Sequence, residues 1–591
     1  MNSQTHQSVA AAVAAVHAPD TPAAVRAQAG AFLEAFKARP DCAQTSLELF
    51  FSCSPTAASV AVQGKQAAAL VQGDDTTPLR HFALHALESA FRQHWYAWDR
   101  ATVGRIKSAV VEIAATRLGD ILAEPLAIRE KVVTLLVDAA KRDWPQRWPT
   151  FLDQIVLNQL CRAGFTQADA GVRILRRLAE DGTSPDFNTE LPVKRRHEIL
   201  SALHSSAPQF LPTLLQLLTA QYGAWVQSQR TNKRAILLTG TVLDTLALLC
   251  DWLPLEVIYN PPSPAADMRQ IFATLMQEPH VATRCLAARC LTRCIARHKV
   301  MTPTIEPYVL PMLNVVTGVC MRQLGMSAPA PAGGGRGAGG VPTSILPSVI
   351  TEDVLTRAAA VDATAAAAAA INENEYDFYK LLATLIGVTG VNLIAKMDDP
   401  CGTGPSGDNG AMLRNFLDVA LVLLAHPSIE ISTEVLSAWS QLFERTPAVL
   451  SSPHALPLRG ALLHILTIKL RKWGSPDDSD RSGLVSAFSV FDYDDHEAFL
   501  VAYGKIRGRV TSLIRCLSRA DPNVALQHLG RTVHALLTGP HATPRDMLRP
   551  STTTLATMWS TCFVLSESIA TLTDVIVCSV GSYNEVSSGD G

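Results

Sequence analysis

Cysteine and histidine side chains recur at regular spacing in the segment RCLAARCLTRCIARH, where they are Cys285, Cys290, Cys294 and His298. The last three follow one another at steps of four residues, so they would share one stripe of a single helix. A zinc site instead needs four ligands that converge as a tetrahedron, usually from a turn and a second element. Buried free cysteine behaves as a small hydrophobic residue. The segment is therefore interpreted as a core helix, and we expect no metal site here.

Acidic residues gather in the segment FDYDDHEAF, residues 491–499. A calcium loop of the helix–loop–helix kind needs glycine at its sixth position, between alternating oxygen ligands. Counted from Asp492, that position holds Glu497, so the pattern does not fit. The sequence favours a solvated acidic turn anchored by Phe491 and Phe499, and a contact with a partner is the alternative.

Catalytic motifs are absent from the sequence. It contains no P-loop, no nucleophile elbow, no HExxH zinc motif and no protein-kinase motif set. We therefore expect a binding protein rather than an enzyme, without a cofactor.

Basic side chains form five small clusters. The net charge of the chain is −2, so any attraction for nucleic acid must come from local patches. One cluster is usually a solvated helix face, but several along one surface can follow a phosphate backbone with salt-dependent affinity. The clusters are Arg173/Arg176/Arg177, Lys194/Arg195/Arg196, Arg230/Lys233/Arg234, Lys469/Arg471/Lys472 and Lys505/Arg507/Arg509.

Helical periodicity dominates the chain and determines which elements would carry these residues. Apolar residues recur at steps of four and three over residues 126–142, namely Ile128, Val132, Leu135, Leu136 and Ala139. Helix pairs repeat at roughly 40-residue spacing, which is typical of HEAT repeats. Because one pair cannot bury its apolar face alone, neighbouring pairs stack. The predicted fold is all-α, an α-solenoid superhelix of HEAT-type antiparallel helix pairs, whose long concave surface suits large partners.

Several stretches depart from the helical pattern. Residues 1–24 are predicted to be a disordered N-terminal tail, and residues 541–591 an incomplete C-terminal repeat. Flexible insertions are predicted near residues 327–343 and 398–409 from their glycine, proline and polar content. Residues 381–395 are strongly apolar but shorter than the roughly 20 residues of a membrane span, so a buried helix is expected there.

Two Trp-Pro pairs stand in the segment AAKRDWPQRWPTF, residues 139–151. Proline lacks a backbone N–H and clashes with the preceding turn, so a helix must end near Arg142, and each residue before proline is pushed out of the α conformation. Thr150, with Asp153 three residues later, resembles a capping box that would start a helix over 151–160. The sequence predicts a rigid corner whose indoles fill the groove between helices. The corner residues are Trp144, Pro145, Trp148 and Pro149.

The corner also resembles a known family. A helix that ends in a basic-acidic pair followed by WPxxWPxF is typical of exportins of the importin-β (karyopherin-β) superfamily. Further stretches, in order along the chain, are similar to the exportin-5 subfamily, its plant counterpart included: RHFALHALESAFRQHWYAWD (80–99), LRRLAED (175–181), LPVKRRHEIL (191–200), LDTLALLCDWLPLEVI (243–258) and FDYDDHEAFLVAYGKIRGRV (491–510). The resemblance runs from about residue 25 to 537, interrupted by the glycine- and alanine-rich insertions.

This resemblance implies a nuclear export receptor that shuttles between nucleus and cytoplasm. Such a receptor is a monomer that binds the GTPase Ran in its GTP form, nucleoporin FG repeats and structured RNA. The implied cargo is double-stranded hairpin RNA of the precursor-microRNA type, or tRNA or proteins; neither a membrane nor DNA is an expected partner. The implied map is 25–105 for Ran-binding repeats, 106–270 for exportin-1-like HEAT repeats and 271–540 for further HEAT repeats.

The resemblance also suggests contact residues. The Ran-facing candidates lie on the inner helix of the second repeat and are Arg80, His81, Leu84 and Phe91, with core packing as the alternative for Leu84 and Phe91. The RNA-binding candidates come from the basic clusters and are Lys194, Arg195, Arg196, Lys469, Arg471, Lys505 and Arg507.

Other functions remain open at this point. Members of the family are longer than this chain, so we expect a C-terminal arch, with part of the RNA cradle and of the Ran contact, to be missing. An importin or a protein-cargo exportin is one alternative. A HEAT-repeat scaffold unrelated to transport, whose binding would not depend on nucleotide, is the other.

Overall fold

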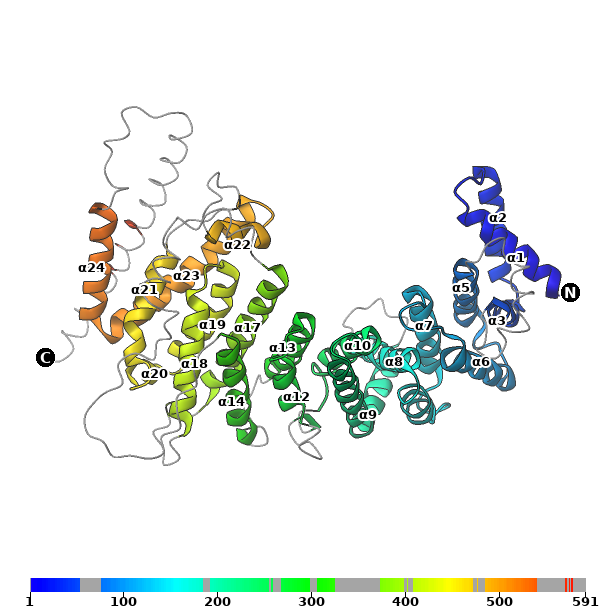
Figure 1. Ribbon diagram of the computed structural model, residues 1–591, viewed down its shortest axis with the longest axis horizontal. Helices are drawn as coiled ribbons and strands as arrows, with labels where there is room; N and C mark the ends of the chain where they lie inside the picture. The colour runs from blue at the N-terminus through cyan, green and yellow to red at the C-terminus, as the bar shows by residue number, and fades with distance from the viewer. Residues whose placement is uncertain are drawn as a thin grey trace. The chain divides into compact units, whose positions relative to one another are not determined.

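The computed structural model describes residues 2–53, 76–183, 192–254, 257–258, 267–297, 306–324, 372–397, 401, 408–470, 476 and 484–538, with residues 569–570, 573 and 576–577. Within these ranges the regular elements are all helices, and no strand occurs (Figure 1). The predicted insertion at 327–343 and most of the predicted segments 398–409 and 541–591 lie outside them.

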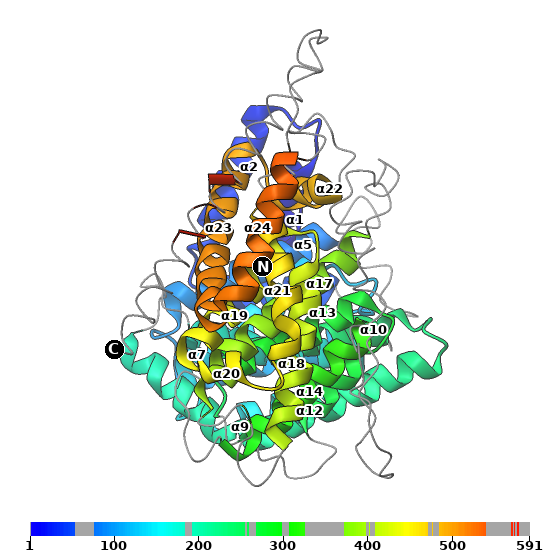
Figure 2. The same ribbon diagram turned by 90° about the vertical axis from the view of Figure 1, so that its left-hand side faces the viewer.

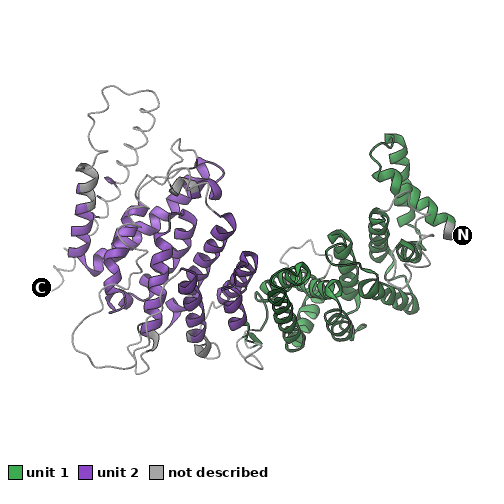
Figure 3. Cartoon of the chain, in the orientation of Figure 1, with its two compact units in different colours: residues 1–268 green, residues 269–591 purple. Residues whose placement is uncertain are grey.

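The chain divides into two compact units, Met1–Met268 and Arg269–Gly591 (Figure 3). This division lies close to the predicted boundary after residue 270. The predicted boundary between residues 105 and 106 has no counterpart, because it falls inside the helix α6, Arg100–Glu112. The remaining predicted domain limits stay predictions.

Unit 1 is built from helices that alternate between two layers. The A layer contains α3, α6, η1, η2 and α9, and the B layer contains α5, α7, α8 and α10. Neighbours within each layer pack on one another, and each A-layer helix packs on the next B-layer helix, with α6 and η1 both packing on α7. The bounds are α1 Asn2–His17, α2 Ala23–Lys37, α3 Cys42–Cys53, α5 Thr77–His94, α6 Arg100–Glu112, the π-helix η1 Ile113–Arg117, α7 Leu126–Asp143, the π-helix η2 Phe151–Leu160, α8 Phe165–Thr183, α9 Val193–Gln227 and α10 Lys233–Leu249.

Unit 2 repeats this arrangement. Its A layer runs through α14, α18, α21 and α24, and its B layer through α13, α17, α19 and α23; Figure 2, in which unit 2 faces the viewer, shows α23 and α24 side by side. The bounds are α12 Met268–Leu275, α13 Val281–Ala296, α14 Glu306–Gln323, α17 Glu373–Asn392, the 3-10 helix η5 Ile394–Lys396, α18 Asp408–Ala425, α19 Ile429–Arg445, α20 Ala448–Ser451, the 3-10 helix η6 Leu456–Leu458, α21 Arg459–Lys469, α22 Leu484–Asp492, α23 His496–Ala520 and α24 Pro522–Thr538. The predicted fold class, a stack of HEAT-type helix pairs, is confirmed.

The N-terminal tail was predicted wrongly. Residues 2–17 form α1, which packs against α2 and α5 and buries Val9 and Val13. The alanine-rich sequence there lacks large side chains, so its apolar stripe is weak. Alanine is nevertheless the best helix former, and a neighbouring pair covers the few valines that the stripe contains.

The helix α9 also differs from its sequence pattern, which predicts separate helices over 195–205 and 212–226. The structure has one helix of 35 residues with Pro208 and Pro212 inside it. Each proline removes one backbone hydrogen bond. The buried residues Leu203, Phe210 and Leu214 continue the same apolar face across both prolines, and packing of that face against α8, α10 and η2 maintains the helix.

The apolar helix α17 is a core element of unit 2. Residues 373–396 are long and apolar enough to span a membrane, but 61% of the apolar 18-residue window within them is buried in the fold, where α17 packs between α13 and α19. Two glycines permit a close approach to α19. A Cβ at Gly390 would lie 2.5 Å from the Cβ of Ala438 and 3.0 Å from the Cζ of Phe416, and one at Gly387 would lie 2.7 Å from the Glu434 carbonyl oxygen.

We predict that Gly390→Ala destabilises the protein by about 1–3 kcal/mol, because the added methyl group would force α17 and α19 apart. Urea unfolding monitored by circular dichroism measures this change. The matched control is Gly504→Ala in α23, where an added Cβ has no neighbour within 4 Å and helix propensity should raise stability by roughly 0.5–1 kcal/mol. Equal effects of the two substitutions would contradict the close approach.

Candidate functional site

The Trp-Pro corner joins α7 of the B layer to η2 of the A layer. The helix α7 ends at Asp143, and Trp144 takes an extended backbone conformation (φ −83°, ψ 140°), as expected before proline. The indole of Trp144 is buried, whereas that of Trp148 is half-buried and lies 4.6 Å from the Phe151 ring centroid. The predicted capping box at Thr150 is wrong, because its side chain makes no capping hydrogen bond and residues 151–160 form a π-helix.

Arg195, predicted to contact RNA, holds this corner. Its guanidinium donates to the carbonyl oxygens of Lys141 (2.8 Å) and Trp144, and to the side chains of Gln146 (2.7 Å) and Glu198 (2.8 Å). The side chain is only 16% exposed. Arg195 therefore ties the start of α9 to the end of α7, and its donors are directed toward the chain itself.

A second group of charges fixes the corner from α6. The Lys107 ammonium pairs with the buried Asp143 carboxylate and lies 4.8 Å from the centroid of the Trp148 ring. Arg147 approaches the same carboxylate at 3.8 Å with its side chain 70% exposed. Two cations thus share one carboxylate, and one of them remains largely in solvent.

The B layer of unit 1 is connected by buried ion pairs. Asp169 on α8 is fully buried and accepts hydrogen bonds from Arg129 of α7 (2.5 Å), Arg173 (2.9 Å) and the Thr241 hydroxyl of α10 (2.9 Å). A buried carboxylate is tolerated only when it is paired and hydrogen-bonded. Asp169 is therefore a point at which three consecutive B-layer helices are joined.

Further pairs extend this connection in both directions. Several of these pairs involve arginines that the sequence analysis considered as phosphate contacts, namely Arg173 and Arg176 of the first basic cluster and Arg234 of the third. The pairs are Lys131–Glu88, Arg173–Glu130, Lys141–Asp181, Arg176–Asp244 and Arg234–Asp120.

The Ran-facing candidates do not form a common surface. Leu84 and Phe91 are fully buried on α5, so they pack in the core and cannot touch a partner, which was the alternative interpretation. The Arg80 guanidinium pairs with Glu124 at 3.0 Å, lies 5.2 Å from the Phe50 ring centroid and is 11% exposed.

His81 is the one residue of this set with substantial accessible surface, and it is half-buried. Burial, followed by the positive charge of Lys131, lowers the pKa of His81 below its usual value. The imidazole is therefore neutral at physiological pH and can donate and accept one hydrogen bond each.

The RNA-binding candidates are distributed over both units. Lys194 on α9 and Lys505 on α23 are exposed, whereas Arg196 and Arg507 are half-buried. Arg471 lies outside the described residues. Of the seven, the two exposed lysines are the ones that the structure leaves best placed for contact with phosphate.

Lys469 has an internal role at the end of α21. Its ammonium donates a hydrogen bond to the carbonyl oxygen of His426, in the turn between α18 and α19. Burial lowers the pKa of Lys469 to about 7. Burial also lowers the pKa of His426 to about 3, so that side chain stays neutral.

The acidic turn between α22 and α23 differs from its predicted form. The Asp492 carboxylate is buried rather than solvated, and it accepts hydrogen bonds from Tyr376 (2.5 Å), Lys380 (3.1 Å) and Ser428 (3.3 Å). Phe491 is 44% exposed, so only Phe499 acts as the predicted anchor. Asp492 thereby links α22 to the starts of α17 and α19.

The cysteine stripe of α13 belongs to the core. Cys290 and Cys294 are buried, and His298 lies outside the described residues. Among the residues that the structure describes, no group of three or more histidine, cysteine, aspartate or glutamate side chains could hold a metal ion.

Comparison with known proteins shows which family the chain resembles. Residues 125–291 match the family model described as "Exportin 1-like protein". The chain is 25% identical to exportin-5 of Homo sapiens over 458 residues, 76% of this chain and 33% of that protein. It is 23% identical to exportin-5 of Dictyostelium discoideum over 464 residues, 76% of this chain and 35% of that protein. The predicted resemblance to exportins is confirmed.

This exportin-like chain spans about a third of the length of the curated relatives that it matches. The matched region begins at Pro125, directly before α7, and ends within α13, so it includes the Trp-Pro corner and Asp169. Among solved structures, importin β covers 96% of this chain and 68% of its own length at 12% identity, with a TM-score of 0.36.

The residues that sequence reasoning missed are mostly acidic. Asp169 lies between the buried Ala168 and Ala170 on α8, and a charged residue inside an apolar stripe requires a partner on a neighbouring helix. That signal was available in the sequence. The identity of the partners was not, because Arg129 and Thr241 are about 40 and 70 residues away along the chain.

We predict that Arg195→Ala lowers the free energy of unfolding by about 2 kcal/mol, because the carbonyl oxygens of Lys141 and Trp144 lose a charged donor. Urea unfolding, monitored by tryptophan fluorescence, measures this free energy. The neighbouring exposed residue supplies the control, since Lys194→Ala should change stability by less than about 0.5 kcal/mol. If both variants unfold like the wild type, Arg195 does not hold the corner.

We also predict that Lys469→Met is more stable than the wild type at pH 6. The folded-state pKa near 7 lies below the unfolded value of about 10.4, so at low pH folding must bury an ammonium that is already charged. Wild-type stability should rise relative to the variant as the pH increases from about 7 to about 10. Thermal melts of both proteins across this range measure the difference, and a difference independent of pH would contradict the prediction.

Proposed function

We propose that this chain acts in nuclear export, binding Ran in its GTP form and carrying structured RNA from nucleus to cytoplasm. The observation that carries the proposal is the exportin-1-like region at residues 125–291, set within a similarity to exportin-5 proteins over 76% of the chain. The cargo class is hairpin RNA of the precursor-microRNA type, or tRNA or proteins. Nucleoporin FG repeats are the proposed contacts during passage between the compartments, and the receptor is a monomer.

The architecture supports a receptor for large partners. Each unit contains a row of B-layer helices that are held together by ion pairs or by close helix packing. Such rows form extended surfaces rather than enclosed substrate cavities. Two partners that favour the same arrangement of a helix stack raise each other's affinity by the same factor, which would couple Ran to cargo.

Accessible residues narrow the proposed contacts. His81 is the Ran candidate with exposed surface, and Arg80 would act indirectly by keeping α5 against the turn that carries Glu124. Lys194 and Lys505 are the proposed phosphate contacts. A hairpin would be recognised through its A-form shape and its phosphates rather than through its base sequence.

The test uses the full chain, immobilised and offered Ran locked with GTP or GDP, with and without a hairpin RNA that has a short 3′ overhang. We expect capture of the GTP form alone, strengthened by RNA at least about fivefold, a typical coupling factor. Capture that is equal in both nucleotide states would overturn the transport proposal in favour of a scaffold. Nucleotide-dependent capture without enhancement by RNA would indicate a protein-cargo exportin, and Ran binding that displaces cargo would indicate an importin.

The salt dependence of hairpin binding tests the lysines separately. Replacing either Lys194 or Lys505 by alanine should lower the slope of log affinity against log salt by about 1. The control is Arg195→Ala. The Arg195 guanidinium is directed at the corner, so its loss should leave the slope unchanged. A wild-type affinity that does not respond to salt would rule out a surface that follows phosphates.

A further inference from the structure

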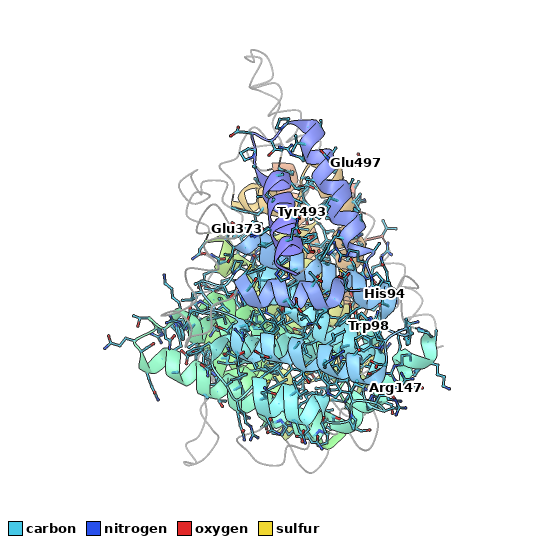
Figure 4. All side chains as sticks on the ribbon, turned by 90° about the vertical axis from the view of Figure 1, so that its right-hand side faces the viewer. His94, Trp98, Arg147, Glu373, Tyr493 and Glu497 are labelled. Carbon is cyan, nitrogen blue, oxygen red and sulfur yellow. The ribbon has the colours of Figure 1, made fainter. Side chains whose placement is uncertain are left out.

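Exposed aromatic rings gather at one edge of unit 1, in the two turns that lead from a B-layer helix to the next A-layer helix. The α5–α6 turn carries Tyr96 and Trp98, and the α7–η2 corner carries Arg147 and Trp148. We call these four residues the aromatic edge. Tyr96 is 81% exposed, and Trp98 and Trp148 are half-buried. Figure 4 shows Trp98 and Arg147 at the same edge of the unit.

In the α5–α6 turn, the Trp98 ring packs on buried aromatic rings. The Trp98 ring lies 6.0 Å from that of Trp95 and 6.1 Å from that of Phe91, both of which are buried. The guanidinium of Arg142, at the end of α7, lies 5.7 Å from the centroid of Trp95. Trp98 is therefore a fixed ring, and the Arg142 contact joins its turn to the corner that carries Trp148.

The second half combines a ring with positive charge. Trp148 packs on Phe151 and has the Lys107 ammonium 4.8 Å from its centroid. Lys107 is neutralised by the buried Asp143, while the Arg147 side chain is 70% exposed and only 3.8 Å from the same carboxylate. An accessible guanidinium thus accompanies an accessible indole.

The surroundings of the edge are basic. Exposed cations follow both turns, and the exposed acid Asp99 is engaged as the N-cap of α6, accepting from the Thr102 N–H at 2.8 Å. The exposed cations are Arg92, Arg100, Arg105 and Arg147. Arg92 pairs with Glu88 at 2.9 Å and keeps 53% of its side chain exposed.

Aromatic faces beside solvent-accessible cations match the chemistry of single-stranded nucleic acid. Every base has a face that can stack on an indole or phenol ring, and each phosphate can pair with a guanidinium. A duplex cannot use such rings, because its bases are already stacked on one another. RNA is read through splayed bases chiefly in its single-stranded segments.

We propose that the aromatic edge binds single-stranded RNA, with Tyr96, Trp98 and Trp148 as stacking platforms and Arg147 as a phosphate contact. This goes beyond the export proposal, because it needs neither Ran nor a hairpin. The site is formed by unit 1 alone.

The test measures fluorescence anisotropy of a labelled oligouridine of about twelve nucleotides, within the range of known single-strand sites, titrated with the full chain in the absence of Ran. Tyr96→Ala should weaken binding about fivefold or more through the loss of one stacked base. Arg147→Glu should weaken it by at least as much and reduce the salt slope. Tyr96 is largely exposed, so Tyr96→Ala should melt like the wild type. Arg147→Glu places a carboxylate near the buried Asp143, so its binding is measured below the onset of its thermal melt.

Matched controls lie elsewhere in unit 1. Arg162→Glu reverses an exposed charge in the turn between η2 and α8, at the opposite edge, and Phe32→Ala removes a ring that is 41% exposed on α2. Neither should change the affinity. Unchanged binding by the Tyr96→Ala/Arg147→Glu double variant, or equal losses with the controls, would overturn the proposal.

A blunt RNA duplex of equal length completes the test as a competitor. It should displace the labelled strand at least about tenfold less effectively than unlabelled oligouridine, because its bases cannot reach the rings. Equal competition would show that phosphates alone are bound and would overturn the stacking role. Ran and the hairpin are absent from these measurements. A negative result for oligouridine therefore does not test the export proposal, and a negative result in the Ran assay does not test the aromatic edge.

Discussion

The arrangement of unit 1 depends on the buried contact of Asp169 with Arg129, Arg173 and Thr241. A carboxylate in the interior is costly unless its charge and lone pairs are matched, and losing one partner leaves an uncompensated charge. Apolar faces bring α7, α8 and α10 together, but such faces would allow one helix to slide along another. The hydrogen bonds of Asp169 allow only one register between these helices. The neighbouring pairs, such as Lys131–Glu88 and Arg176–Asp244, repeat the same constraint along the B layer.

This constraint also separates structural cations from those available to partners. Arg173, Arg176 and Arg195 looked alike in the sequence to Lys194 and Lys505, since all belong to short basic clusters. In the structure the arginines join helices, while the two lysines face solvent. The guanidinium group, with five donors in a planar fork, suits several carbonyl and carboxylate acceptors at once. A compact ammonium on a flexible stem is more easily left at the surface.

Much of the fold could be predicted because it follows from local periodicity. The stripe from Ile128 to Ala139 is buried as expected, and α7 ends before Pro145 as predicted. Long-range effects were beyond the sequence pattern. Packing of α1 orders a segment with a weak stripe, packing of α9 overrides Pro208 and Pro212, and burial removes Leu84 and Phe91 from any surface. The candidate site was least predictable, because the partners of Arg195 and Asp492 are far away in the chain.

Both units use ion pairs between B-layer helices, as Arg284–Glu375 does between α13 and α17 in unit 2, but the α17–α19 junction is different. In unit 1 the junctions are ion pairs with polar side chains long enough to adjust, whereas at the α17–α19 junction the Gly387 and Gly390 backbone lies directly against α19. Long charged side chains can follow a small rotation between helices without losing contact, but a backbone seated against Ala438 cannot. The α17–α19 junction should therefore keep a fixed angle, whereas junctions made by ion pairs keep their register but tolerate a small rotation between the helices.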